Sequence, residues 1–185
     1  MNNKIVIGDN TFFTSDTHFY HNAMLAKGIR YFNSVEDMND EMVSCWNATI
    51  NNNDTVIHLG DFSLGGKKEI KEILSRLNGK IILVRGNHDH TKNLKIFKDH
   101  GIDIHDILRI THKDQYIVAS HYPMLTWDKA HYGSWHIHGH CHGNLPLTYE
   151  PRVDLSWDVY QRPIPIDELY SIFANRKYTP IDHHI

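Results

Sequence analysis

Residues 80–89 read Lys80-Ile81-Ile82-Leu83-Val84-Arg85-Gly86-Asn87-His88-Asp89, an apolar run followed at once by polar side chains. A short, nearly continuous apolar run rich in β-branched residues is typical of a strand buried on both faces. The four residues after it offer a backbone turn, an amide oxygen, an imidazole and a carboxylate. In open α/β sheets, ligands bind at the carboxyl ends of the strands. The stretch therefore predicts a buried strand that delivers functional side chains.

The same pattern recurs along the chain, where four more apolar runs end in side chains suited to metal binding or acid–base chemistry. These are Thr11–Ser15 before Asp16-Thr17-His18, Thr55–Leu59 before Gly60-Asp61, Gln115–Ser120 before His121, and Trp135–His138 before Gly139-His140-Cys141-His142. The five runs predict one buried sheet with its functional groups along one edge. A sixth strand, Lys4–Ile7, precedes the turn residues Gly8-Asp9-Asn10, which predict a hairpin with Thr11–Ser15.

Amphipathic segments alternate with these strands. Ser34 is placed to cap a helix from Val35 to about Ile50, and apolar stripes predict three further helices, about Lys68–Leu77, Thr91–Asp99 and Ile166–Asn175. Alternating strands and helices predict an α/β fold. With neither a repeat nor a long linker in the sequence, we expect residues 1–185 to form a single domain.

Composition narrows the class of protein. The chain has 185 residues, 41% of them hydrophobic and 22% charged, with a formal net charge of −3, which is ordinary for a globular domain. This charge gives no indication of a basic surface for a nucleic-acid polymer, although it leaves room for a local basic groove. We expect no membrane association, because no apolar run approaches ~18 residues. The N-terminus lacks the apolar run of a signal peptide, so a cytoplasmic location is expected. Cys45 and Cys141 do not form a C-x-x-C pair.

Histidine is the unusual component, at 16 residues. Taken singly, Asp16-Thr17-His18, Asp61 and His121 fit turn or structural roles better than functional ones. Together, the motifs supply two carboxylates, one amide and four imidazoles, with His88 left over. This mixed nitrogen and oxygen set suits Mn, Fe, Zn or Ni better than Mg or Ca. Seven ligands exceed the need of one ion, so two ions sharing a carboxylate are expected. Cys141, between two strand-spaced histidines, is expected to face away.

The ordered blocks D-T-H, G-D, G-N-H-D, H and G-H-C-H resemble the calcineurin-like metallophosphoesterase superfamily. They span Asp16 to His142, and the tail from Val153 to Asp158 with Pro163 is similar to that of small single-domain bacterial and phage members. The resemblance implies a four-layer αββα sandwich with two mixed β-sheets.

The resemblance also implies roles by position. Asp16, His18 and His142 would hold a first divalent transition-metal ion, Asn87, His121 and His140 a second, and Asp61 would bridge them, with Mn the first choice and Fe, Zn or Ni the alternatives. A metal-activated hydroxide would attack phosphorus. His88 would act as the general acid that protonates the leaving oxygen, and Asp89 would orient the His88 ring.

Two segments, Phe19–Ser34 and Tyr122–Ser134, are candidates for the rim of the site. They contain His21, Arg30, Tyr122, Trp127, Lys129 and His131. We expect substrate binding by Arg30 on phosphate, by Trp127 stacking on a base or sugar, and by His21, although ordinary packing or solvated charge explains each residue better when it is taken singly.

The leading hypothesis is a metal-dependent phosphodiesterase acting on a small, nucleotide-like phosphoester. A phosphomonoesterase for nucleotides or phosphoproteins is the alternative, and a catalytically silent metal-binding scaffold is a third reading. Oligomeric state has no signature in the sequence. The final Asp182-His183-His184 is expected to be a flexible end.

Overall fold

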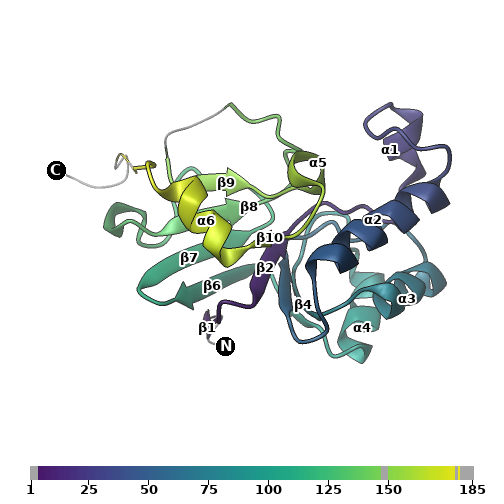
Figure 1. The fold of residues 1–185 in the computed structure, drawn as a ribbon, viewed down its shortest axis with the longest axis horizontal. Coiled ribbons are helices and arrows are strands. Elements are labelled where there is room, and N and C mark those ends of the chain that lie inside the picture. Colours follow the sequence, from purple (N-terminus) through teal and green to yellow (C-terminus); the bar gives the residue numbers. More distant parts are fainter. Residues whose placement is uncertain (1–3, 147–149, 178, 180–185) are drawn as a thin grey trace.

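Two five-stranded mixed sheets form the centre of the protein (Figure 1). The computed structural model describes residues 4–146, 150–177 and 179, so the final Asp182-His183-His184 lies outside the described residues. The first sheet has the order β1 (Lys4–Val6), β6 (Ile107–His112), β7 (Gln115–Ser120), β8 (Trp135–His138) and β9 (Arg152–Asp154). The second has the order β10 (Ile164–Pro165), β2 (Thr11–Thr14), β3 (Thr55–His58), β4 (Lys80–Val84) and β5 (Asp103–His105).

The expected hairpin at Gly8-Asp9-Asn10 is wrong. β1 pairs in parallel with β6, Lys4 opposite Arg109, whereas β2 pairs in parallel with β3, Thr11 opposite Thr55. The turn residues therefore carry the chain from one sheet into the other. A turn signal marks a change of direction, and it does not determine which strands pair.

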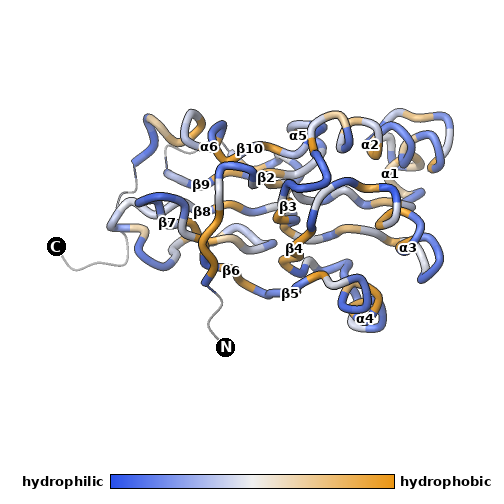
Figure 2. The backbone as a smooth tube through the Cα atoms, turned by 60° about the horizontal axis from the view of Figure 1, so that its bottom comes forward, coloured by the Kyte–Doolittle hydropathy of each residue, from blue (hydrophilic) through white to orange (hydrophobic). Residues whose placement is uncertain are grey.

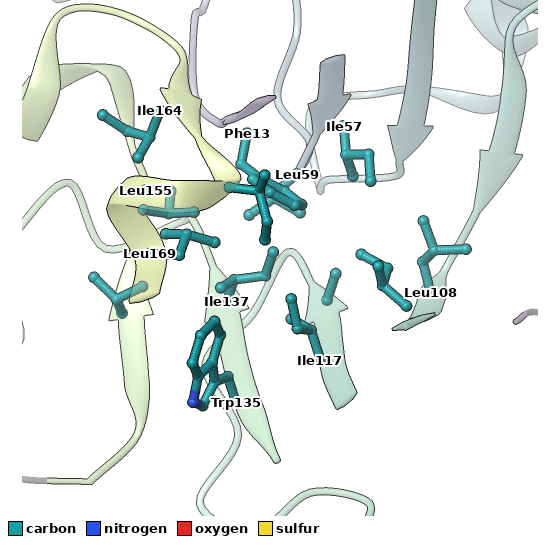
Figure 3. Packing of buried hydrophobic residues seen from close by; sticks show 14 of the residues in the cluster. Phe13, Ile57, Leu59, Leu108, Ile117, Trp135, Ile137, Leu155, Ile164 and Leu169 are labelled. Atoms are coloured by element: carbon teal, nitrogen blue, oxygen red, sulfur yellow. The ribbon is translucent and has the colours of Figure 1, made fainter. Parts of the chain in front are cut away.

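The interior lies between the two sheets. Phe13, Ile57 and Leu59 come from the second sheet and meet Leu108, Ile117 and Ile137 from the first, and Figure 3 shows these side chains pointing toward one another. All six are fully buried. Burying this much apolar surface is the main favourable contribution to folding.

Three helices cover the other face of the second sheet. They are α2 (Val35–Thr49), α3 (Lys67–Arg76) and α4 (Thr91–Asp99), which lie to one side of β2, β3, β4 and β5 in Figure 2. Their apolar stripes pack against Val56 and Leu83. Ser34 caps α2, as predicted, by accepting a hydrogen bond of 3.0 Å from the backbone N–H of Asp37.

The outer face of the first sheet has a thinner cover. Along β7, Ile117 and Ala119 point inward, and Val118 packs outward against Trp127 and Ala130 in the segment that carries the 3-10 helix η1 (Ala130–Tyr132).

The last helix, α6 (Ile166–Phe173), contacts β10 and β2, and the Phe173 ring stacks on Trp135 at 4.6 Å. The α/β fold class with two mixed sheets is thus confirmed.

Two further short helices, α1 (Asn22–Ala26) and α5 (Trp157–Tyr160), flank the ends of the strands and were not predicted. Over the described ranges, the helices are all too short or too polar to cross a bilayer.

Candidate active site

The side chains after five strands converge at the carboxyl edges of both sheets. β2, β3 and β4 of the second sheet lead into residues 16–18, 60–61 and 86–89, and β7 and β8 of the first sheet lead into residues 121 and 139–142. The expectation of a single sheet edge is therefore corrected, because two sheets contribute. Backbone hydrogen bonds connect the loops within each sheet, with Gly139 N–H donating to the carbonyl of His121 at 3.0 Å and Asp16 N–H to that of Gly60 at 2.9 Å.

Three motif glycines allow the loops to approach this closely. A Cβ on Gly139 would lie 1.9 Å from Ser15 Oγ, one on Gly86 2.2 Å from Asp61 Oδ1, and one on Gly60 2.5 Å from the backbone nitrogen of Gly86. Gly60 also has a φ of +102°, a backbone conformation that residues with a side chain rarely adopt. Glycine at these positions is thus required by contact between loops.

The first ligand cluster contains Asp16, His18 and His142, which offer ligand atoms within 4.8 Å of one another. His18 Nε2 and His142 Nε2 each lie 3.7 Å from Asp16 Oδ1, too far for a hydrogen bond and well suited to ligands ~2.1 Å from a shared ion. Within the described part of the chain, Asp16 Oδ1 and His18 Nε2 are buried without a hydrogen-bond partner. Buried polar atoms are normally satisfied, so these two atoms fit a bound cation.

The second cluster combines Asp61, His121 and His140 with the amide of Asn87. Asn87 Oδ1 lies 2.9 Å from His121 Nε2 and 3.0 Å from His140 Nδ1. His121 Nδ1 donates to the carbonyl of Leu59 at 2.9 Å, which leaves Nε2 with its lone pair facing the cluster. Asn87 and His140 are exposed, so this cluster is more open to solvent than the first, in which Asp16 and His18 are buried.

Asp61 lies between the two clusters. Its Oδ2 is 3.7 Å from His18 Nε2 and 3.5 Å from His121 Nε2, one atom from each group. Its Oδ1 accepts a hydrogen bond of 2.7 Å from the backbone N–H of His88. This carboxylate is therefore oriented from one side and presented to both clusters from the other.

Five of these ligands have left-handed backbone conformations. The φ angles of Asp16, His18, Asp61, His140 and His142 lie between +49° and +70°. The spacing at i and i+2 of Asp16 with His18, and of His140 with His142, does not continue an extended strand, because β2 ends at Thr14 and β8 at His138. The ligands are instead brought together by a strained, left-handed turn after each strand. Such strain is stored most often at functional sites.

A half-buried pair, Asp158 and His142, supports the first cluster from behind. Asp158 Oδ2 accepts a hydrogen bond of 2.6 Å from His142 Nδ1, leaving Nε2 of that ring toward Asp16. This bond raises the pKa of His142, with burial working against it. Burial alone would raise the pKa of Asp158, but the hydrogen bonds from His142 and Arg30 lower it to about 2. A carboxylate behind a ligating histidine fixes its tautomer. Sequence reasoning assigned Asp158 no role.

Arg30 is this carboxylate's second partner, which corrects the expectation that it binds substrate phosphate. It is 7% exposed, and its guanidinium donates to both oxygens of Asp158, at 2.7 and 3.0 Å, and to the carbonyls of Thr17 and Asp16. Every nitrogen of the guanidinium is thus engaged inside the protein, so Arg30 holds the loop of the first cluster in place.

Asp89 does not orient the ring of His88, as had been expected. Its Oδ2 accepts hydrogen bonds of 2.8 Å from the backbone N–H groups of Asp61 and Gly86, and its Oδ1 accepts one of 3.1 Å from Phe62. Burial raises the pKa of Asp89, and these amides oppose the shift. Asp89 therefore joins the loops after β3 and β4.

Of the remaining predicted residues, His88 and His21 lie at the mouth of the site and Trp127 does not. The His88 side chain is 37% exposed, with Nε2 4.0 Å from Asp61 Oδ2. His21 Nδ1 lies 3.2 Å from His18 Nδ1, and burial with the neighbouring imidazoles lowers the pKa of His21 to about 4. Trp127 is buried, and its indole N–H donates to the carbonyl of Ser134 at 3.1 Å, so it cannot stack on a substrate.

A cavity of about 530 Å³ adjoins the second cluster. Asn87 and His121 of the second cluster line it together with Arg85, His90, Tyr122 and Met124. Its volume falls within the ~300–1,000 Å³ typical of small-molecule sites. Tyr122, 51% exposed, packs its ring 4.5 Å from that of His140. Exposed and pocket-lining residues outside the motifs, such as Arg85 and His90, gave no signal in the sequence.

Comparison with known proteins agrees with this geometry. The calcineurin-like phosphoesterase family matches residues 10–184. The chain is 32% identical over 173 residues to the uncharacterized protein MJ1445 of Methanocaldococcus jannaschii, covering 88% of this chain and 90% of that one. It is 27% identical over 197 residues to the Gene 66 protein of Mycobacterium phage L5, covering 88% and 93%.

A solved structure has the same architecture. The protein of unknown function AQ665 from Aquifex aeolicus superposes with a TM-score of 0.71 and 27% identity, covering 88% of this chain and 98% of that one. The match of the family over nearly the whole chain, together with ligand clusters of the kind that divalent metals require, shows that the chain belongs to the calcineurin-like phosphoesterases, a family of metal-dependent phosphoester hydrolases.

Proposed function

We propose that the protein is a phosphodiesterase that uses two divalent transition-metal ions, with manganese the first choice and Fe, Zn or Ni as alternatives. The observation that carries the proposal is the position of Asp61, whose Oδ2 lies within 3.7 Å of a ligand atom from each cluster. One carboxylate shared by two ligand sets suits two ions a few ångströms apart. When bound, the ions supply Lewis acidity toward a phosphoryl oxygen and a water of lowered pKa.

The protein's own groups complete the chemistry. His88 supplies a proton to the leaving oxygen, and its partly exposed ring borders the mouth, close enough to meet a substrate at the clusters. If His18 faces a metal with Nε2, its Nδ1 carries the hydrogen and donates to Nδ1 of His21. His21 then presents its own Nε2–H to a phosphoryl oxygen, which supports its proposed role in substrate binding.

The diester preference rests on the space beside the second cluster. A diester carries a second ester group, and the cavity of about 530 Å³ offers it room, with Tyr122 as a face for a planar group. A nucleotide-like substrate fits these dimensions. A monoester carries only one organic group, so it needs space on only one side of the phosphorus.

The first test compares bis-p-nitrophenyl phosphate with p-nitrophenyl phosphate, using chelator-treated protein to which Mn, Ni, Zn or Mg is restored. We expect turnover only with transition metals, and higher kcat/KM for the diester. Preference for the monoester would instead support a phosphomonoesterase, and bound metal without turnover on any phosphoester would support a silent scaffold.

The acid role of His88 needs a second substrate. His88→Ala should reduce hydrolysis of a phenyl diester by about 10²–10⁴-fold and of the p-nitrophenyl diester by less, because a good leaving group needs little protonation. His131→Ala, an exposed histidine outside the clusters, is the matched control. Equal losses on both substrates would exclude His88 as the general acid.

A further inference from the structure

A third group of metal-competent side chains borders the loop that follows β8. His138, Cys141 and Asp154 offer one ligand atom each, all within 4.8 Å of one another. His138 is the last residue of β8 and Asp154 the last of the neighbouring strand β9, so the sheet itself sets their separation. None of the three belongs to the two clusters described above, and Cys141 lies in the sequence between a ligand of each.

The hydrogen bond of His138 prepares its ring for metal binding. Its Nδ1 lies 2.9 Å from the carbonyl oxygen of Gly139, which can only accept, so Nδ1 carries the hydrogen and Nε2 keeps a lone pair. The ring is 2% exposed. Histidine ligands commonly donate the other ring N–H to a backbone carbonyl in this way.

The charge and composition of the group suit a divalent ion of the zinc type. A thiolate and a carboxylate balance two positive charges, and a set of one sulfur, one nitrogen and one oxygen is within the usual range of zinc. A cavity of about 160 Å³, lined by His138 and Asp154, adjoins the group and leaves room for a water as fourth ligand.

Existing hydrogen bonds leave capacity for an ion. Asp154 accepts from the backbone N–H groups of Gly143 and Ser156, both at 2.9 Å, and from Ser156 Oγ, whereas a carboxylate has about four acceptor positions. Two cations line the same cavity, and both are engaged elsewhere. Arg152 lies 3.4 Å from Glu150 and donates to the carbonyl of Met124, and Arg176 donates to the carbonyl of Arg152.

We propose that His138, Cys141 and Asp154 form a separate binding site for a zinc-type ion. This site ties β8 to β9 beneath the loop that presents His140 and His142. Ser156 Oγ, which contacts both Asp154 Oδ1 and Asp16 Oδ2, joins it to the first cluster. The proposal concerns binding alone and does not depend on which phosphoester is hydrolysed.

Cobalt(II) provides a specific test, because only a sulfur ligand gives thiolate-to-cobalt charge-transfer absorption in the near ultraviolet. The two catalytic clusters contain nitrogen and oxygen alone. Metal-free full-length protein, kept reduced with a phosphine, is titrated with cobalt. We expect the absorption to saturate at one thiolate-bound cobalt per chain in the wild type and in Cys45→Ser, whose thiol lies on α2, and to be absent from Cys141→Ser.

Three results would overturn the proposal. These are no charge-transfer absorption in the wild type, absorption that survives in Cys141→Ser, and absorption that is lost in Asp16→Asn but retained in Asp154→Asn. The third result would mean that Cys141 binds an ion held by the first cluster. Circular dichroism establishes that each variant is folded. As a second measurement, elemental analysis after zinc loading should show one equivalent per chain fewer in Cys141→Ser than in Cys45→Ser.

Discussion

At the scale of single residues, the site depends on groups that touch no substrate. Asp158 fixes the ring of His142 and is itself fixed by Arg30, although 128 positions separate Arg30 from Asp158 in sequence. Sequence motifs identified the residues that face the clusters because those residues follow strands directly. They could not identify Asp158, nor show that Arg30, Trp127 and Asp89 point inward, because long-range pairing determines where a side chain goes.

Asp158→Asn tests this supporting role. The amide leaves His142 without its anionic partner, so we expect the concentration of Mn for half-maximal activation to rise by about 10–100-fold. Asp128→Asn removes a carboxylate from an exposed ion pair with Arg109 and should leave activation unchanged. Unaltered activation in Asp158→Asn would mean that the hydrogen bond to His142 has no effect on the metal.

At the scale of elements, segments with an uninterrupted apolar run or stripe were predictable, and those without one were not. Gln115–Ser120, Trp135–His138 and Thr91–Asp99 were predicted to the residue, and the other predicted elements end within one or two residues of their expected bounds. Three short strands, β5, β9 and β10, contain too little apolar periodicity to detect, whereas the equally short β1 was predicted. β6 was also missed, because Arg109 and His112 interrupt its apolar character.

Contact between elements makes Gly86 sensitive to substitution. In Gly86→Ala the new Cβ would lie 2.2 Å from Asp61 Oδ1 and must displace the shared carboxylate. We expect phosphoesterase activity to fall about 100-fold, since a shift near 1 Å at a reacting group has that effect. Gly101→Ala, at φ +74° with open space around it, should cost about 1 kcal/mol of stability and preserve kcat. Equal activity in the two variants would contradict this close-contact argument.

At the scale of the whole molecule, two buried imidazoles make stability depend on pH. Burial is the largest cause that lowers the pKa of His58 and of His136 to about 3 from 6.5. The His58 ring accepts a hydrogen bond from the backbone N–H of Gly60, and the His136 ring accepts one from that of Met124. Protonation of the accepting nitrogen would break either bond.

The unfolded chain therefore binds these protons before the folded one does. Their contribution to stability is complete above about pH 6.5 and is lost as the pH falls toward 3. Urea unfolding of metal-free protein should show a lower midpoint at about pH 5 than above pH 7, and His136→Gln should show a smaller decrease. If the midpoint of His136→Gln decreased with pH as much as that of the wild type, His136 would not contribute to the pH dependence of stability.

The division of the ligands between two sheets has a kinetic consequence. Asp16 accepts a hydrogen bond from the backbone of His140, 124 positions later, and neither ligand cluster exists until both sheets have docked. Metal ions therefore find their sites only after the folding barrier has been crossed. The free energy of metal binding should therefore slow unfolding and leave the folding rate nearly unchanged. A chelator would then shorten the lifetime of the folded protein without altering how fast the protein forms.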